Sequence, residues 1–312
     1  GGKTMTETDT EKPVVPSPKI VAIIPAYNEE RFIGSVVLQS RKYVDAVIVV
    51  DDGSSDATAE IAEAAGAIVI RHPQNLGKGA TLNTGFREAR KLLPQAVVIL
   101  DADGQHQARE IPLVIQPVLD GKADIVVGSR FLGVRSPIPP LRVLGMRALT
   151  IVSNLGSGVN VSDSQTGFRA FSKEALANIA FRARGFSVES EMQFLAKELG
   201  LRITEVPISV HYTDATKRNM IAQGLEVLNG ILQLMGQHRP LLFFGVPGFT
   251  MLLLGLWWGY RVVDIYRKVQ ELAIGYALLA VLLCIVGSVI LSTGITLHTL
   301  RALLLELVRK RE

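Results

Sequence analysis

Two long stretches without charged residues, both near the C-terminal end, constrain the fold of this chain most strongly. Pro240–Tyr260 contains 21 such residues and Leu272–Leu300 contains 29. As a helix the shorter stretch spans about 31 Å, which matches the hydrocarbon core of a bilayer, and the longer one must tilt or protrude. We therefore predict two transmembrane helices. The alternative is a pair of buried core helices, although soluble helices of this length nearly always carry charges.

The positions of lysine and arginine predict how these helices are oriented. Seven basic residues flank them on the chain-terminal sides: Lys217, Arg218, Arg239, Arg301, Arg309, Lys310 and Arg311. The short connection between them carries three: Arg261, Arg267 and Lys268. This excess predicts a multi-pass protein of the cytoplasmic membrane with both termini and the preceding domain in the cytoplasm. Trp257, Trp258 and Tyr260 stand at the far end of the first span, as interfacial aromatic residues do.

The rest of the chain divides into three parts. Residues 1–18 are polar, lack the apolar core of a signal peptide, and are interpreted as a flexible tail, with Gly1–Thr4 an expression remnant before a native Met5. Residues 19–215 have the composition of a soluble domain. Residues 216–239 are expected to form an amphipathic helix, with apolar residues at helical spacing over Met220–Gln237. That helix is predicted to lie along the membrane surface or to pack on the soluble domain. Residues 240–312 hold the two spans and a basic tail.

Composition excludes two classes of site. The net charge is only +4, and no basic stripe with interleaved aromatic residues is present, so no nucleic-acid partner is expected. The single cysteine, Cys284, permits neither an intramolecular disulfide nor a cysteine-rich zinc site.

Strand and helix signals alternate through the soluble part. Strands are predicted at Ile20–Pro25, Ala46–Val50, Ala67–Ile70, Ala96–Leu100 and Ile125–Gly128. Helices are predicted at Glu29–Lys42, from an N-cap at Ser55 through Ala65, at Lys78–Leu93 and at Arg109–Leu119. Fully apolar strands alternating with helices indicate an α/β domain with a Rossmann-like, mostly parallel sheet covered on both faces. Ligands of such sheets bind beyond the carboxyl ends of the strands.

Polar residues follow each of the five predicted strands. The segments are Pro25-Ala26-Tyr27-Asn28-Glu29, Asp51-Asp52-Gly53-Ser54, Asn75 with Gly77-Lys78-Gly79, Asp101-Ala102-Asp103-Gly104-Gln105-His106, and Gly128-Ser129-Arg130. One such segment commonly caps a helix, but five at strand ends predict a common site. The glycine spacing fits neither a Walker A loop nor, after the first strand, a dinucleotide fingerprint, and glycines 77 and 79 either contact a ligand or let the chain turn.

Asp101 and Asp103 are alternate residues of an extended segment, so both carboxylates can approach one ion. Such oxygen ligands suit Mg²⁺ or Mn²⁺, which bind one or two carboxylates together with substrate phosphates. Gln105 can add a neutral oxygen. His106 either ligates the ion or has a hydrogen-bonding or packing role.

Taken together, these segments resemble glycosyltransferase family 2 with its GT-A fold, over about Lys19–Thr213. The likeness is greatest to dolichyl-phosphate mannose synthases and to bacterial polyprenyl-phosphate glycosyltransferases with C-terminal transmembrane helices. The resemblance implies an inverting transfer of one hexose-type sugar from a UDP- or GDP-linked donor to a polyprenyl phosphate, dolichyl or undecaprenyl.

The same resemblance implies roles for particular residues. The donor nucleotide would be bound by Pro25, Tyr27, Glu29, Val50, Asp52 and Lys78, together with Asp101, Ala102 and Asp103. The metal would be held by Asp101, Asp103 and Gln105. Asp103 and Arg130 would act in catalysis, and the acceptor phosphate would be bound by Arg130, Arg142, Lys217 and Arg218. The sugar pocket would be closed by Asp163, Thr166, Gly167 and Glu191.

One segment departs from the family pattern. The mannose synthases continue from their last strand to an arginine and then Gly-x-Ser-Lys, whereas this chain reads His211-Tyr212-Thr213-Asp214-Ala215-Thr216-Lys217-Arg218-Asn219. Lys217 or Arg218 either replaces that basic pair or faces solvent or lipid headgroups. The segment Leu141–Val159, apolar and with Arg142 and Arg147, is predicted to dip into anionic lipid or to serve as a packing helix.

Two other functions are consistent with the sequence. A transferase acting on a lipid hydroxyl needs a general base, for which Asp163, Glu189 and Glu191 are candidates. A degenerate membrane scaffold or sugar sensor would have no use for the Asp101/Asp103 pair. The sequence identifies neither the sugar nor its nucleotide, and leaves homo-oligomerisation open.

Overall fold

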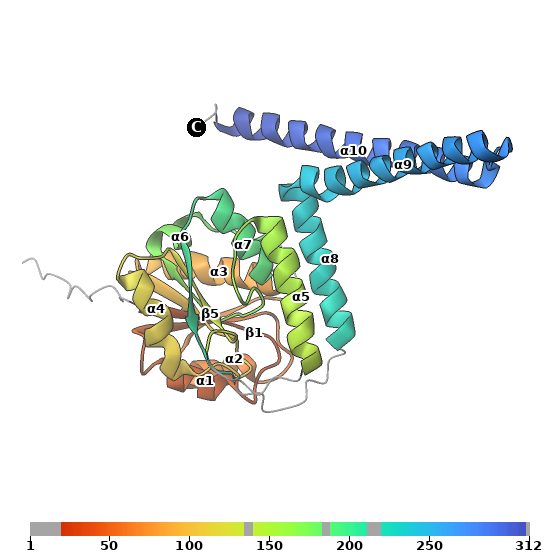
Figure 1. Ribbon diagram of the computed structural model, residues 1–312. Helices are drawn as coiled ribbons and strands as arrows, with labels where there is room; N and C mark the ends of the chain where they lie inside the picture. Colours follow the sequence, from red (N-terminus) through yellow and green to blue (C-terminus); the bar gives the residue numbers. More distant parts are fainter. Residues whose placement is uncertain (1–19, 134–139, 183–187, 211–219, 310–312) are drawn as a thin grey trace, which may run out of the picture.

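The computed structural model describes residues 20–133, 140–182, 188–210 and 220–309, and omits the side chains of residues 140–142, 220–224, 226–227 and 304–309. Its N-terminal part is a seven-stranded sheet with helices on both faces (Figure 1). Two long helices, α9 and α10, form a hairpin that projects from this domain. This arrangement confirms the predicted α/β domain followed by two long apolar helices.

The sheet has the order β3-β2-β1-β4-β6-β5-β7, and β6 alone runs antiparallel to its neighbours, β4 and β5. The strands are β1 (Ile20–Ala26), β2 (Ala46–Asp51), β3 (Ile68–Arg71), β4 (Ala96–Ile99), β5 (Ile125–Ser129), β6 (Arg169–Ser172) and β7 (Ile203–Pro207). The first five agree with the predicted strands within one or two residues. Neither the antiparallel β6 nor β7 was predicted from the sequence.

The helices cover two faces of this sheet because successive strand residues point to opposite sides. Alternate residues of β1 illustrate this, since Ala22 and Ile24 belong to one core and Val21 and Ile23 to the other. The first core contains α1 (Ile33–Ser40), α2 (Thr58–Ala64) and α4 (Ile111–Leu119), which follows a 3-10 turn at Ala108–Glu110. The second contains α3 (Lys78–Lys91), α6 (Lys173–Asn178) and α7 (Val188–Glu198).

Two predicted helix starts were wrong. The first helix begins at Ile33 rather than at Glu29, because the chain turns through residues 29–32. The second begins at Thr58, and Ser55 does not cap it. Instead, the Ser55 backbone N–H donates to Asn28 Oδ1 at 2.9 Å, which ties this loop to the turn after β1.

Helices α5 (Pro140–Ser157) and α8 (Met220–His238) lie side by side at the edge of the domain (Figure 1). Their contact is apolar and includes Phe194 of α7: the buried members are Phe194, Ile231, Leu234 and Met235, with Leu149 and Val152 packed against them. Leu144, Ile151 and Leu155 of α5 remain exposed, as does Leu225 of α8. The amphipathic helix therefore packs on the domain with one face and leaves apolar side chains exposed on another.

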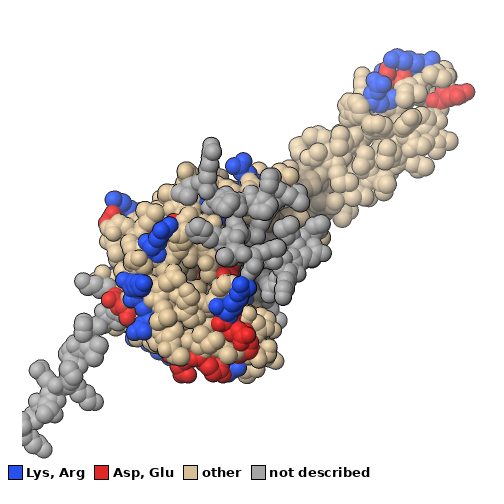
Figure 2. All heavy atoms as spheres, turned by 90° about the horizontal axis from the view of Figure 1, so that it is seen from below, with Lys and Arg blue, Asp and Glu red and all other residues tan. Residues whose placement is uncertain are grey.

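The projecting hairpin consists of a π-helical turn (Leu241–Gly245), α9 (Val246–Val269) and α10 (Ile274–Arg309). Both helices are long and apolar enough to cross a bilayer, and only 17% and 11% of their most apolar windows are buried. Figure 2 shows charged side chains gathered at the far tip of an otherwise uncharged shaft. The segment predicted as a connection, with Arg261 and Arg267, is helical and belongs to α9.

Glycines let the two helices of the hairpin approach at the backbone. A Cβ added at Gly255 would lie 2.8 Å from the Cys284 nitrogen and 3.0 Å from the Ala280 oxygen. One added at Gly287 would lie 2.6 Å from the Leu252 nitrogen. Small residues at such contacts are typical of helix pairs that associate in lipid, where close van der Waals packing replaces the hydrophobic effect.

Polar contacts connect the base of the hairpin to the sheet domain. Arg239 donates to the carbonyl oxygen of Ser157, at the end of α5, at 3.1 Å. Glu198, at the end of α7, lies 3.2 Å from His238 Nδ1 and 3.7 Å from Arg301 Nη2. The hairpin is thus fastened to the same two helices that flank the candidate site.

Candidate active site

The turn after β1 and the loop after β2 form one wall of the candidate site. Asn28 donates its backbone N–H to Ser54 Oγ at 2.9 Å and accepts from Ser55 N through its side chain. Glu29 N–H donates to Thr58 Oγ1 at 2.8 Å. Asn28 has φ +55°, which asparagine tolerates better than most residues. These bonds bring the first two predicted segments together.

The residues predicted at the nucleotide base differ in accessibility. Tyr27 is 41% exposed, and Pro25 is half-buried and lies opposite Val50 in the β1–β2 register. Val50 itself is fully buried in the core against α3. Tyr27 and Pro25 can therefore contact a ligand with their side chains, whereas the Val50 side chain serves packing.

Asp52 organises the segment that leads into α3. Its carboxylate accepts from His72 Nδ1 at 2.7 Å, from Leu76 N at 2.9 Å and from Gly77 N at 2.8 Å. Gly77 has φ +90°, a conformation that favours glycine. Asp52 is only 4% exposed, so its chief visible effect is to fix the position of Lys78, the first residue of α3.

Lys78 joins two carboxylates in the centre of the site. Its Nζ lies 2.6 Å from Asp101 Oδ1, after β4, and 2.6 Å from Glu189 Oε1, in the first turn of α7. Burial alone would lower the pKa of Lys78, but the two carboxylates raise it above its ordinary value. Burial opposes ionisation of Asp101, yet Lys78 and His106 lower the pKa of Asp101 to about 2. Both groups are therefore charged at neutral pH.

Asp103, Gln105 and His106 follow on the same loop. Gln105 N–H donates to Asp103 Oδ1 at 3.0 Å. Burial, and then the charge of Asp101, raise the pKa of Asp103 above its usual range. Burial lowers the pKa of His106, against the effect of the two aspartates. The His106 ring packs on Phe168 with 5.2 Å between ring centroids.

The possible metal ligands on this loop fit a divalent cation that also binds phosphate. His106 Nδ1 is buried without a hydrogen-bond partner in the described part of the chain, and it lies 3.9 Å from Asp101 Oδ2. Asp101 and Asp103 add carboxylate oxygens, and the charge of Asp101 disfavours the ionisation of Asp103. Among the described residues no three acidic, histidine or cysteine side chains form a ready ligand cluster. A bound ion would thus take ligands from a substrate as well as from the protein.

Arg130, after β5, is held in place by Asp163. Its Nε and Nη2 donate to the two Asp163 oxygens at 2.6 and 2.7 Å, and its backbone N–H donates to Oδ2 at 3.2 Å. Both side chains are almost completely buried. A bidentate pair of this kind fixes the plane and direction of the guanidinium. Asp163, predicted in the sugar pocket, therefore positions Arg130.

Gly167 lies directly against Asp101. A Cβ added at Gly167 would meet Asp101 Oδ2, and would lie 2.6 Å from Oδ1 and 2.7 Å from Cγ. The neighbouring Thr166 is 1% exposed. Arg169, at the start of β6, is equally buried and holds this segment by donating to the carbonyl oxygens of Thr166 and Ser164 at 3.0 and 2.8 Å.

The sequence did not reveal the full roles of Arg169 and Glu189 in the site. Burial lowers the pKa of Arg169 to about 10, against Glu189 and Asp163, which raise it. Sequence reasoning treated Glu189 only as a general base, and it is the partner of Lys78. The signal available in the sequence was the pair of acidic residues, Glu189 and Glu191, and the structure places both, buried, in the first turn of α7.

The remaining predicted residues are distributed around this centre. Glu191 is buried and accepts from Arg182 N at 2.8 Å, and Ala102 is a core residue. Arg142 lies in the first turn of α5, with its side chain outside the described residues. Lys217 and Arg218 also lie outside them.

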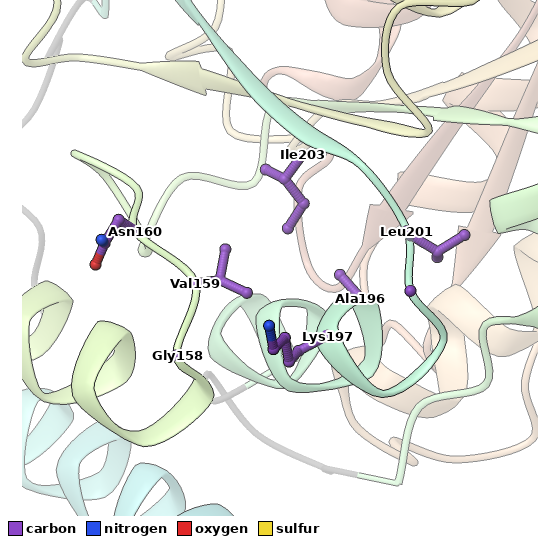
Figure 3. Close-up of a pocket in the computed structure, with 8 residues that line it drawn as sticks. Gly158, Val159, Asn160, Ala196, Lys197, Leu201 and Ile203 are labelled. Atoms are coloured by element: carbon purple, nitrogen blue, oxygen red, sulfur yellow. The ribbon is translucent and has the colours of Figure 1, made fainter.

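A separate depression of about 410 Å³ lies between the ends of α5 and α7 and the start of β7 (Figure 3). Its lining includes Asn160, Lys197 and Ile203, and none of the predicted site residues. It is therefore distinct from the site around Asp101.

Residues 21–179 match the family model described as glycosyl transferase family 2. The chain is 38% identical over 237 residues to the UDP-N-acetylglucosamine–dolichyl-phosphate N-acetylglucosaminyltransferase of Methanococcus voltae, a match that covers 68% of this chain and 91% of the relative. It is 32% identical over 206 residues to the undecaprenyl-phosphate mannosyltransferase of Micrococcus luteus, covering 61% and 83%.

The solved structures include a similar enzyme with bound ligands. Glucosyl-3-phosphoglycerate synthase from Mycobacterium tuberculosis, in complex with Mn²⁺, UDP-glucose and phosphoglyceric acid, superposes with a TM-score of 0.57 at 26% identity. The match covers 70% of this chain and 80% of that one.

Proposed function

This chain belongs to glycosyl transferase family 2, and we propose that it moves one hexose-type sugar from a nucleotide-sugar donor to a polyprenyl phosphate, with inversion, at the cytoplasmic face of a membrane. The acceptors in the names of two relatives, dolichyl phosphate and undecaprenyl phosphate, support this choice of lipid.

The observation that carries the proposal is that every candidate general base is already engaged. Asp163 binds the Arg130 guanidinium through both oxygens, Glu189 binds Lys78, and Glu191 accepts from the backbone of Arg182. Carboxylates whose oxygens already accept these hydrogen bonds are less available to take a proton from a hydroxyl group. The site is therefore poorly suited to deprotonate a lipid hydroxyl.

A phosphate acceptor needs no such base. The second pKa of a phosphate monoester is about 6, so at pH 7 the nucleophile is already mostly dianionic. What it requires is alignment and relief of charge repulsion, because two phosphate-bearing substrates must meet. Arg130, oriented by Asp163, is suited to that task. Single displacement on an α-linked donor would give a β-linked lipid phosphosugar.

The donor would bind along the wall formed by the first two loops. Pro25, Tyr27 and Glu29 would contact the base, Asp52 would fix the loop beside the ribose, and Lys78 would face the diphosphate. Thr166 and Gly167 would close the sugar pocket above Asp101, with Glu191 at its far side.

Asp101 and Asp103, with Gln105 beside them, would hold Mg²⁺ or Mn²⁺, and the Mn²⁺ in the solved relative supports this assignment. When bound, the ion supplies positive charge that stabilises the departing diphosphate. Asp101 and Asp103 orient the phosphate end of the donor.

The C-terminal helices would anchor the domain so that it meets a lipid acceptor at the interface. Helices α9 and α10 would span the bilayer, and the exposed apolar residues of α5 and α8 would face its surface. Arg142, Lys217 and Arg218 are assigned to the acceptor phosphate. The domain organisation follows as a catalytic part over 19–215, a juxtamembrane helix over 216–239 and an anchor over 240–312.

The test is sugar transfer by the purified full-length protein with Mn²⁺ and a polyprenyl phosphate in detergent. Radiolabelled UDP- and GDP-sugars are supplied one at a time, and the anomeric linkage of the product is determined. We expect a β-linked lipid phosphosugar and a rate that rises with pH through a single limb near pH 6. An α-linked product would contradict the single displacement. Transfer only to a lipid hydroxyl, with large losses in Glu189→Gln or Glu191→Gln, would overturn the choice of acceptor.

A further inference from the structure

Lys78 is unusual because its ammonium group already forms an ion pair with Asp101, the carboxylate that is expected to bind a metal ion. Nζ lies equally close, at 2.6 Å, to Asp101 Oδ1 and Glu189 Oε1. The Lys78 side chain is 20% exposed and that of Glu189 only 6%. The cluster holds two negative charges and one positive charge, so it has room for further positive charge.

We infer that Lys78 is an internal counter-ion that a divalent cation displaces from Asp101, and that Glu189 is the positioning residue that retains the displaced ammonium beside the donor site. This inference rests on the proposed function, because it takes Asp101 as a ligand of the ion. It assigns Glu189 a role other than proton transfer.

The geometry favours replacement of Lys78 by a cation at Asp101 over simple dissociation of Lys78 from Asp101. Breaking the Lys78–Asp101 contact without a replacement would leave a largely buried carboxylate unpaired, which is costly. A cation bound to Asp101 would keep that carboxylate paired, and Glu189 would keep the displaced Lys78 ammonium paired. A lysine suits this task because its ammonium is a point charge on a flexible stem.

Only the side chain of Lys78 is free to move in this exchange. The backbone before it is fixed by the bonds from Leu76 N and Gly77 N to Asp52. Thr81 N–H donates to the Gly77 carbonyl oxygen at 3.1 Å, which closes the first turn of α3. The ammonium can therefore swing from Asp101 toward a bound diphosphate while the helix stays in place.

The experiment measures Mn²⁺ binding to the full-length protein in detergent by electron paramagnetic resonance, without donor or acceptor. Lys78→Met should bind Mn²⁺ roughly tenfold more tightly, the usual contribution of one charge-assisted hydrogen bond. Glu189→Gln should bind it several-fold more weakly, because Lys78 then pairs with Asp101 alone. Lys91→Met, an exposed lysine of the same helix, is the matched control and should leave the affinity unchanged.

The double variant Lys78→Met/Glu189→Gln separates exchange from a general effect of charge. It keeps the net charge of the cluster and leaves no unpaired glutamate, so it also guards against misfolding of the single variant. Exchange predicts that it still binds Mn²⁺ roughly tenfold more tightly than the wild type. Wild-type affinity in the double variant would overturn the inference.

A structure of the Mn²⁺–UDP complex gives a direct readout, and exchange predicts that Nζ has left Asp101. An Nζ still within hydrogen-bond distance of Asp101 would also overturn the inference. Because no acceptor is present in either measurement, failure to glycosylate polyprenyl phosphate would count against the proposed function alone.

Discussion

Replacing Gly167 by alanine tests whether the segment before β6 must touch Asp101. The new methyl group would lie 2.6 Å from Asp101 Oδ1, whereas ordinary contacts begin at 3.4 Å. One of the two groups must therefore move by nearly 1 Å. Thr166 and Phe168 are fully buried and Arg169 ties the segment down, so we expect Asp101 to be displaced.

A displacement of about 1 Å at a reacting centre can cost roughly a hundredfold in rate. We therefore expect kcat to fall about a hundredfold in Gly167→Ala, with a loss of about 1–3 kcal/mol in the free energy of unfolding from overpacking. The assay is sugar transfer at saturating substrates, with thermal unfolding measured in parallel. The matched control is Gly145→Ala in α5, where an added Cβ meets nothing within 4 Å. A kcat within threefold of the wild type in Gly167→Ala would refute this reasoning.

Three further predictions concern the ion, the acceptor and the anchor. Asp103→Asn should nearly abolish transfer, as should EDTA, and full activity in either case would exclude the metal role. Arg142→Ala should raise the KM for polyprenyl phosphate far more than that for the donor, with partial rescue by lysine; a defect in donor KM alone would move Arg142 to the diphosphate. Gly255→Ala should separate α9 from α10 and lower the midpoint of thermal unfolding in detergent, relative to Gly275→Ala. An unchanged midpoint would show that the hairpin accommodates the methyl group.

Much of the fold could be predicted because its signals are local. The strands up to β5 are apolar runs bounded by polar turns, and each lies within one or two residues of its predicted position. The two C-terminal helices are marked by length and absence of charge. β6 could not be predicted, because a four-residue strand depends on the register of β4 and β5 rather than on its own residues.

The site was predicted as a set of residues but not as a set of pairs. Strand ends identify Asp101, Arg130 and Lys78 because chain connectivity brings such ends to one edge of the sheet. The partners Asp163 and Glu189 come from distant elements, and only the folded structure shows which cation each one holds. Ser55 failed as a helix cap for the same reason, since it bonds to the turn after β1.

The antiparallel course of β6 has a consequence for how such a protein can diversify. The chain leaves the sheet after Ser129 and returns at Arg169, and Val127 lies opposite Arg169 in the register of β5 and β6. The two ends of the intervening excursion therefore lie on adjacent strands, whose spacing is about 4.8 Å. An insertion with adjoining ends can be lengthened, shortened or exchanged as a unit without shifting any other strand. This excursion carries α5 and Asp163, whereas the loops around Tyr27 and Asp52 lie outside it, so α5 can be altered while those two loops keep their positions.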